Sequence, residues 1–260
     1  MKEVYLSQEK KRNDLWKTLK FFLIGLILEG FFILILYLII YSPVFKINEV
    51  QIINNENTSF EDVLNFIKIN IFSDSYFKKI LGFQNILIWP NFLENNYNTF
   101  AQIKNISIEK DYFKKNILIK VQERKSIGLW CVYQESKCFE FDEEGYLFNK
   151  TFFSEGSATL KIFDFTSRKL SIGNFALEKR LFDNLNLILK VLEKNNLNVE
   201  KIDLKNLETE EIIVKLFDGP YIYFSLNFSP PDLEPIINKI NNFNNLKYID
   251  LRVENRVYYK

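Results

Sequence analysis

Residues 21–41 read FFLIGLILEGFFILILYLIIY, and this stretch decides how the rest of the chain is organised. A helix of this length spans about 31 Å, which matches the roughly 30 Å hydrocarbon core of a bilayer. Glu29 is the only charged residue in the stretch, and Pro43 follows it closely and ends the helix. A secretory signal peptide would have a shorter apolar core and a small-residue cleavage site. We therefore expect a transmembrane helix over residues 21–42.

Basic residues gather on one side of this helix. The segment before it contains Lys2, Lys10, Lys11, Arg12, Lys17 and Lys20, whereas Lys46 is the single basic residue close behind it. The positive-inside rule then predicts a single-pass plasma-membrane protein with a cytoplasmic tail over residues 1–20 and an extracytoplasmic C-terminal domain. Glu29 either contacts another membrane helix or is a protonated or snorkelling carboxyl tolerated by a very apolar span, and both interpretations stay open.

The composition argues against several classes of activity. The chain has no histidine, the commonest acid–base group and metal ligand, and its net charge of +1 gives no field that attracts nucleic acid. It contains no phosphate-binding glycine loop, nucleophile elbow or metalloprotease motif. Asp142, Glu143 and Glu144 form a carboxylate cluster, for which we prefer a solvated turn over acid–base or cation chemistry. We expect no enzyme, no cofactor, no metal, no small-molecule substrate and no nucleic-acid partner.

The chain has two cysteines, Cys131 and Cys138. A disulfide is permitted outside the cell, and the residues between the two cysteines suit a hairpin loop that would bring the sulfurs face to face. Two free, partly buried thiols are the alternative, and the sequence alone does not decide between them.

Hydrophobic alternation and turn signals predict an α+β module over residues 43–125. Thr58 or Ser59 is the expected N-cap of the first helix. Residues 72–89 are rich in aromatics and are left unassigned. The expected elements are a strand over 44–55, a helix from about residue 60, a helix over 90–101, and a hairpin of strands 103–110 and 116–124.

The remainder, residues 126–260, predicts a second α+β domain on a mostly antiparallel sheet. Residues 177–192 have the apolar spacing of an amphipathic helix, and Asp218-Gly219 is a strong hairpin turn. Pro230 and Pro231 are expected to start a short helix. The expected strands cover residues 126–133, 137–141, 146–148, 160–165, 199–204, 211–217, 221–226 and 247–259.

Four short patterns follow one another along the chain. They are F-x-I-x-x-V-x-I at residues 45–52, V-x-E-R at 121–124, D-x-x-G-x-x-F at 142–148 and I-D-L-R at 249–252. In this order, behind a single membrane helix, they resemble the FtsQ/DivIB family of bacterial cell-division proteins. The resemblance implies a POTRA module over residues 43–125, whose first strand helps to recruit division proteins, and a C-terminal β domain over 126–260.

The resemblance also implies a function. It predicts a non-enzymatic scaffold of the divisome, at the division septum, that binds bitopic proteins of the FtsB/DivIC and FtsL types outside the membrane. The partner would add a strand to the last strand of the sheet, so that early and late division proteins become linked. The implied partner-binding residues are Arg252, Val253, Glu254, Asn255, Arg256, Val257 and Tyr258.

Other interpretations stay open. The last strand could simply complete the sheet, with its tyrosines facing the core. At the level of the whole protein, the alternatives are a POTRA-type accessory of protein translocation or assembly and a membrane-anchored cell-envelope hydrolase.

Overall fold

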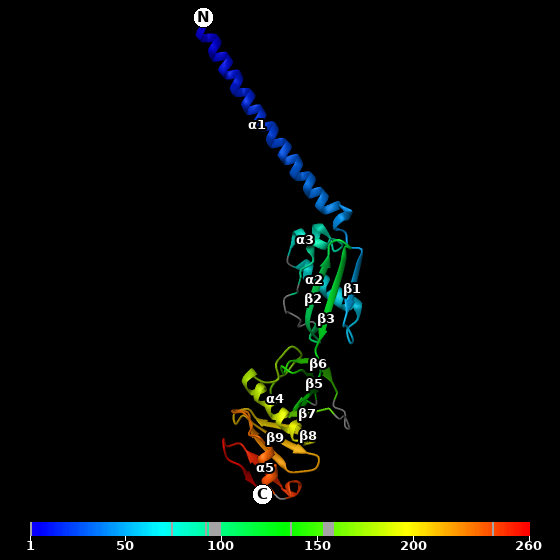
Figure 1. Ribbon diagram of the computed structural model, residues 1–260, viewed down its shortest axis with the longest axis vertical. Coiled ribbons are helices and arrows are strands. Elements are labelled where there is room, and N and C mark those ends of the chain that lie inside the picture. The colour runs from blue at the N-terminus through cyan, green and yellow to red at the C-terminus, as the bar shows by residue number, and fades with distance from the viewer. Residues whose placement is uncertain are drawn as a thin grey trace. The chain divides into compact units, whose positions relative to one another are not determined.

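The computed structural model describes residues 2–73, 75–91, 93, 100–135, 137–152, 159–240 and 242–260, and of residues 2–15 and 135 it describes the backbone only. Contacts divide the chain into two compact units (Figure 1). The first unit is Met1–Glu94 with Asn105–Val121, and the second is Asn95–Lys104 with Gln122–Lys260. Helices and mostly antiparallel sheets make the protein an α+β structure, and each unit is described by itself.

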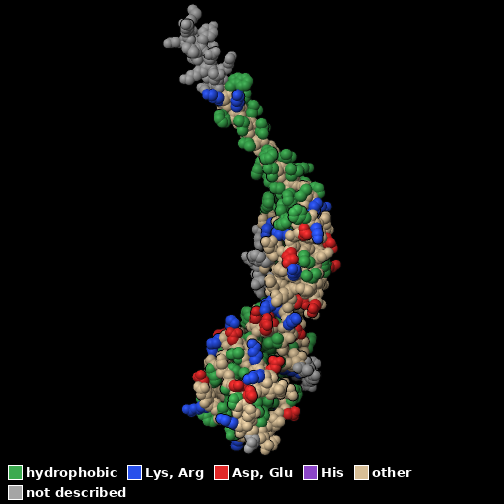
Figure 2. Space-filling view, viewed as in Figure 1, with side chains coloured by type: hydrophobic (Ala, Val, Ile, Leu, Met, Phe, Trp, Pro, Cys, Tyr) green, Lys and Arg blue, Asp and Glu red, His purple; other side chains and the backbone are tan. Residues whose placement is uncertain are grey.

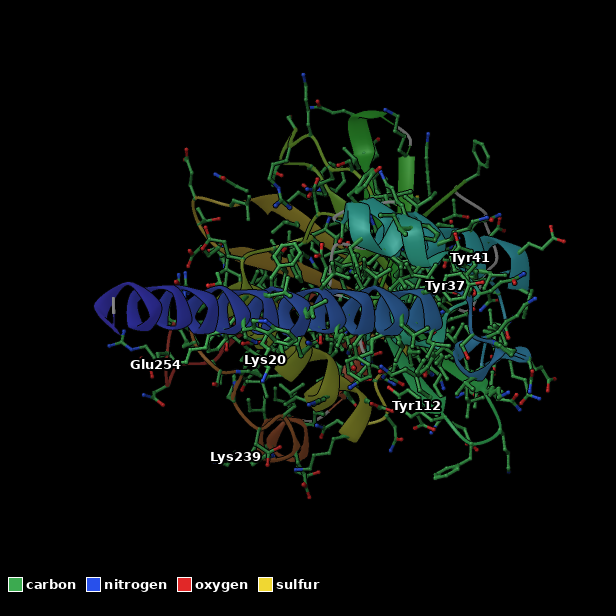
Figure 3. All side chains as sticks on the ribbon, turned by 90° about the horizontal axis from the view of Figure 1, so that it is seen from above. Lys20, Tyr37, Tyr41, Tyr112, Lys239 and Glu254 are labelled. Atoms are coloured by element: carbon green, nitrogen blue, oxygen red, sulfur yellow. A yellow bond between two sulfur atoms is a disulfide. The ribbon has the colours of Figure 1, made fainter. Side chains whose placement is uncertain are left out.

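A single long helix, α1, covers Lys2–Tyr41. It ends at Tyr41, where the apolar stretch predicted it to end, but it begins well before the apolar stretch. From Trp16 to Tyr41 the helix is long and apolar enough to cross a membrane, and none of its most apolar window is buried. Figure 2 shows a nearly continuous hydrophobic surface along this segment. Tyr37 and Tyr41, labelled in Figure 3, lie on its last turns.

The sheet of the first unit has three strands in the order β1-β3-β2. Strand β1 runs parallel to β3, with Val50 opposite Ile117. The buried face of α2 carries Val63, Phe66, Ile67 and Ile71. The elements are β1 (Glu49–Ile53), α2 (Phe60–Ser73), α3 (Tyr76–Leu81), β2 (Ile103–Asp111) and β3 (Asn116–Glu123), with 3-10 turns at Pro43–Phe45 and Ile86–Ile88.

Local chemistry explains where α2 and the hairpin begin. Ser59 Oγ accepts a hydrogen bond from Asp62 N at 3.1 Å, so Ser59 is the cap, one of the two residues predicted for this role. The predicted strands 103–110 and 116–124 are confirmed to within one residue at each end.

One expectation for the first unit is wrong, and another falls mostly on residues that the structure does not describe. The strand predicted over 44–55 begins only at Glu49, because Pro43 favours a 3-10 turn and the next amides have different partners. Ile47 N donates to Gln84 O, and Asn48 N donates to Lys115 O. The helix predicted over 90–101 falls mostly on residues outside the described ranges, although Pro90 and Asn91 are described and are not helical.

The second unit is built on a nine-stranded sheet in the order β12-β11-β10-β9-β8-β7-β4-β5-β6. Its strands are β4 (Gly128–Val132), β5 (Lys137–Phe141), β6 (Leu147–Thr151), β7 (Lys161–Asp164), β8 (Val199–Asn206), β9 (Glu211–Leu216), β10 (Tyr221–Ser225), β11 (Tyr248–Leu251) and β12 (Tyr258–Tyr259). Neighbouring strands are antiparallel except for β4·β7, β7·β8 and β10·β11.

Helix α4 (Lys179–Lys194) supplies one side of the core of the second unit. Its amphipathic pattern is confirmed, since Leu181, Phe182, Leu185, Ile188 and Leu192 are buried in the same cluster as the inner face of the sheet. The helix predicted at Pro230–Pro231 begins later, as α5 (Glu234–Lys239).

The single C-terminal strand predicted over 247–259 is wrong. The chain forms β11, reverses, and returns as the two-residue β12. Arg256 N donates to Val253 O at 3.1 Å across the reversal, and Asn255 has φ +62°. Asn tolerates this left-handed conformation, which is needed at the third position of such a turn.

A tight turn joins β5 to β6 and contains the D-x-x-G pattern. Asp142 Oδ1 accepts hydrogen bonds from Glu144 N and Tyr146 N. Its other oxygen pairs with Arg124, whose guanidinium lies 3.9 Å from the Tyr146 ring centroid. The V-x-E-R and D-x-x-G patterns therefore meet in one buried ion pair.

Gly145 completes this turn with φ +80°, and a Cβ added there would lie 2.7 Å from the Phe182 ring. We expect Gly145→Ala to lower the free energy of unfolding by about 3 kcal/mol, through backbone strain and overpacking. Gly82→Ala is the matched control, because Gly82 has φ +75° but nothing within 4 Å of its Cβ position. Urea unfolding of the detergent-solubilised chain measures both variants, and equal losses would contradict the packing argument.

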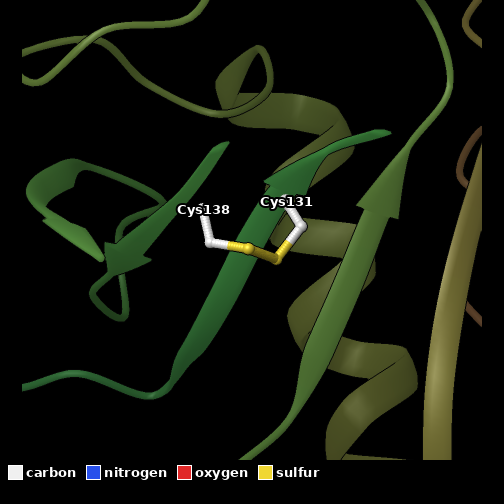
Figure 4. The surroundings of a disulfide bond; sticks show 2 residues. All are labelled: Cys131 and Cys138. Carbon is white, nitrogen blue, oxygen red and sulfur yellow. A yellow bond between two sulfur atoms is a disulfide. The ribbon is translucent and has the colours of Figure 1, made fainter. Parts of the chain in front are cut away.

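Cys131 and Cys138 lie opposite each other on β4 and β5 and form a disulfide with a Cα–Cα distance of 4.0 Å (Figure 4). Both residues are buried. The bond closes a loop with a sequence separation of 7.

Closing a loop of this size removes about 2–3 kcal/mol of chain entropy from the unfolded state. We expect a reductant to lower the free energy of unfolding by that amount, measured by urea titration with and without dithiothreitol. The Cys131→Ala, Cys138→Ala double variant should be insensitive to the reductant. Identical curves for the unmodified chain in both conditions would contradict the prediction.

Candidate protein-binding edge

Strand β12 is the last strand of the sheet in the described part of the second unit, so one of its edges has no neighbouring strand. Lys260 and Tyr248 exchange backbone hydrogen bonds, which makes them a hydrogen-bonded pair of the antiparallel ladder. Tyr259 and Ile249 lie opposite each other and are then a non-hydrogen-bonded pair of the ladder. The backbone N–H and C=O of Tyr259 therefore face away from β11. These outward groups can accept a strand from another chain.

The I-D-L-R pattern positions this edge. Ile249 and Leu251 are buried in the core of the second unit, whereas Asp250 and Arg252 point to the opposite face. Strand alternation explains the pattern: the two apolar residues fix β11 to the core, and the two charged residues pair with each other beside it. Strand β11 is in turn held by β10 on its other side, in parallel register.

Arg252 is engaged within the chain. Its Nε donates to Asp250 Oδ1 at 2.9 Å, and its two terminal nitrogens donate to Asp250 Oδ2 at 2.6 Å and to Glu211 Oε2 at 2.9 Å. Its guanidinium also lies 5.0 Å from the Tyr223 ring centroid. These carboxylates raise the pKa of Arg252, and the hydrogen bonds from Arg252 lower the pKa of Asp250. Arg252 thus anchors the point where β11 ends.

The loop after Arg252 lines a groove of about 320 Å³. Val253, Glu254, Asn255, Arg256 and Val257 form one wall, and the segment before and within α5 forms the other. The second wall consists of Phe228, Ser229, Pro231, Asp232 and Ile236, with Leu251 also lining the groove. The groove therefore lies against the loop that joins β11 to β12, and it offers both apolar and charged contacts.

The structure thus brings most of the predicted partner-binding residues together, but in a loop and not in a strand. Tyr258 is in β12 and half exposed, and Arg256 Nη1 reaches its hydroxyl at 3.5 Å. Figure 3 labels Glu254 in this exposed loop. Sequence reasoning missed the wall at 228–236, whose only local signal is the Ser229-Pro230-Pro231 break.

The opposite edge of the sheet is less open. At the start of β6, Leu147 N donates to Asn174 O and Gly173 N donates to Leu147 O. Tyr146 also forms a bridge with Phe175. A neighbouring segment therefore occupies the outward backbone groups at the start of β6, at Leu147.

Asp142 and Asp164, the two most deeply buried carboxylates of the described residues, are each paired with an arginine. Asp164 accepts hydrogen bonds from Trp130 Nε1 at 3.0 Å and from Arg168 Nη2 at 2.6 Å. Burial works to raise the pKa of Asp164, but hydrogen bonds from Thr166 and Trp130 and the Arg168 charge outweigh it, so the pKa is lowered. Together with the Arg124–Asp142 pair, this arrangement neutralises carboxyl groups within the fold of the second unit.

We expect Asp250→Asn to lower the free energy of unfolding by about 1 kcal/mol at pH 7, a modest value because the guanidinium of Arg252 is partly exposed. Since the folded-state pKa of Asp250 is below its ordinary value, this stabilisation is present above about pH 4 and lost as the pH falls further. Urea titrations at pH 7 and pH 3 measure the difference.

Asp183→Asn is the control, because Asp183 pairs with Lys179 on the exposed surface of α4, where ion pairs contribute little. A loss for Asp250→Asn that persists unchanged at pH 3 would show that the ion pair is not its cause.

No protein-family model matches the chain, and no curated protein matches it. The function must therefore be inferred from the residues and contacts described above.

Proposed function

We propose that the protein is a membrane-anchored, non-enzymatic scaffold of the bacterial divisome. It binds bitopic division proteins of the FtsB/DivIC and FtsL types outside the membrane, at the division septum, by accepting a strand on β12. The observation that carries this proposal is the outward-facing backbone of Tyr259 on the edge of the sheet, beside a groove lined by Val253–Val257.

The N-terminal helix supports the anchoring part of the proposal. The segment Trp16–Tyr41 can span a bilayer, and the basic residues cluster before it. Its two ends carry interfacial aromatic residues, Trp16 on one side and Tyr37 and Tyr41 on the other, all largely exposed. Aromatic rings at both ends are typical of membrane helices, because their amphipathic rings favour the headgroup level.

The first unit supports the resemblance to a POTRA module. Its chain order is β1, α2, α3, β2, β3, and its sheet order is β1-β3-β2 with β1 parallel to β3. A shallow hollow of about 180 Å³ beside β1 is lined by Lys46, Phe83 and Gln84 among others. This hollow lies where the resemblance implies a surface that recruits other division proteins.

The second unit supplies the mechanism. A partner strand that pairs with Tyr259 gains main-chain hydrogen bonds, and its side chains can enter the adjacent groove. Glu254 and Arg256 at the rim offer charges of both signs. Partners held in the same membrane meet this edge at a high effective concentration, so even a short strand suffices for stable association.

Two substitutions at one residue test the mechanism. Tyr259→Pro removes the outward N–H, while Tyr259→Ala keeps that N–H and removes the ring. We expect co-purification of the full chain with FtsB/DivIC-type and FtsL-type proteins to fall by up to about tenfold with proline and much less with alanine, since proline removes the outward backbone donor and alanine keeps it.

The urea-unfolding midpoint of each variant serves as the folding control. Equal retention of the partners by both variants would reject strand addition. Failure of the unmodified chain to retain any division protein would reject the proposed scaffold function itself.

A further inference from the structure

The β2–β3 hairpin presents an exposed aromatic tip. Phe113 is 99% exposed and Tyr112 52% exposed, and Lys114 and Lys115 follow directly. The tip is well defined, because Asp111 Oδ1 accepts hydrogen bonds from Phe113 N and Lys114 N at 3.0 and 2.9 Å. A fully exposed phenylalanine on an ordered turn keeps its apolar area in water. Transfer of this side chain into an apolar environment would lower its free energy.

This tip is fastened to the chain just after α1. Lys115 Nζ donates to Pro43 O at 3.2 Å. Asn48 donates from its backbone to Lys115 O at 2.9 Å and from its side chain to Lys114 O at 3.0 Å. Since Pro43 follows Tyr41 by two residues, the hairpin tip lies at the end of the sheet where the chain leaves the apolar helix.

Helix α3 adds a second set of similar side chains at the same end. Tyr76 is 81% exposed and Phe77 54% exposed, followed by Lys78 and Lys79. Helix α3 contacts α1.

The segment after α3 is also joined to the end of α1. The buried Asn85 donates to Ile39 O at 3.1 Å. That carbonyl is one of the last four of α1, which have no partner within the helix.

We propose that these two elements form a membrane-proximal surface, which binds the headgroup region of the bilayer leaflet that α1 leaves. The surface consists of Tyr76, Phe77, Lys78, Lys79, Tyr112, Phe113, Lys114 and Lys115. Its rings enter the interface at the level of Tyr37 and Tyr41, and its lysines pair with the phosphates of anionic phospholipids. This inference rests on the membrane span included in the proposed function.

The combination of residues favours lipid over a protein partner. Aromatic rings followed by lysines repeat in two separate elements, and lysine is depleted in the core of protein–protein interfaces. Each lysine close to an anionic lipid surface raises the affinity for that surface by about fivefold. When this surface is bound to the bilayer, several points of the first unit attach it to the membrane, in addition to the chain connection at Pro43.

The test places a polarity-insensitive fluorophore at one introduced cysteine in the full chain, reconstituted in nanodiscs that contain lipids brominated near the headgroup and lipids brominated along the acyl chains. The native Cys131 and Cys138 are buried in their disulfide and do not react without reduction. The labelled positions are Phe113→Cys on the surface, Leu34→Cys within α1, and Glu56→Cys. Glu56 follows the far end of β1 and is the matched exposed control.

We expect the bromines to quench the labels at positions 34 and 113 several-fold more than the label at 56. Quenching at 34, with position 113 no more quenched than 56, overturns the surface but leaves the membrane span standing. Absent quenching at 34 overturns the span and the surface with it. If the label at 113 becomes shielded from solvent only after a division protein is added, the surface binds protein and not lipid. That result also overturns the proposal.

Charge is tested separately. In discs with anionic phosphatidylglycerol, quenching at 113 should exceed that in neutral phosphatidylcholine discs, and Lys79→Gln with Lys114→Gln should reduce the difference. Equal quenching in both bilayers for the unsubstituted chain overturns the role assigned to the lysines.

Discussion

The exposed apolar surface of α1 is the constraint on which the rest of the structure depends. Each of its large side chains would gain about 1.5–3 kcal/mol on transfer out of water, and the sum over the helix far exceeds the typical 5–15 kcal/mol stability of a folded domain. An apolar environment must therefore cover α1. The chain leaves this helix at the turn that begins with Pro43, and the polar part of the protein follows.

Local signals predicted much of the fold. Ser59 caps α2, the 103–110 and 116–124 hairpin lies where its alternation placed it, and Asp218-Gly219 reverses the chain between β9 and β10. These features are set by neighbouring residues, so a single sequence contains the information. Apolar spacing likewise identified α4, because its buried face is decided by periodicity alone.

The candidate site was predicted less well, because its shape depends on distant contacts. Arg252 pairs with Glu211, which lies 41 residues earlier, and alternation alone cannot show that this pair ends β11. The wall at Phe228–Ile236 comes from another part of the chain altogether. The residues 253–257 were therefore placed in a strand, although the left-handed Asn255 turns them into a loop. Sequence found the right segment and missed its conformation.

The short patterns themselves have internal roles. Arg124 of V-x-E-R neutralises Asp142 of D-x-x-G, and the two charged residues of I-D-L-R pair beside β11. Removal of one partner of the buried Arg124–Asp142 pair would destabilise the fold strongly, whereas the partly exposed Asp250–Arg252 pair contributes only about 1 kcal/mol. Each pattern can therefore be understood from stability alone. The patterns therefore account for the architecture, whereas binding of a partner would depend on the open edge of the sheet.

The sheet order has a consequence for synthesis. Strand β12 is translated after every other strand of the nine-stranded sheet, and it can pair only once β10 and β11 are in place. A nascent or truncated copy that stops before β12 therefore lacks this edge, however well its earlier strands have folded. If partners assemble through the edge as proposed, they bind only copies whose synthesis has passed β12.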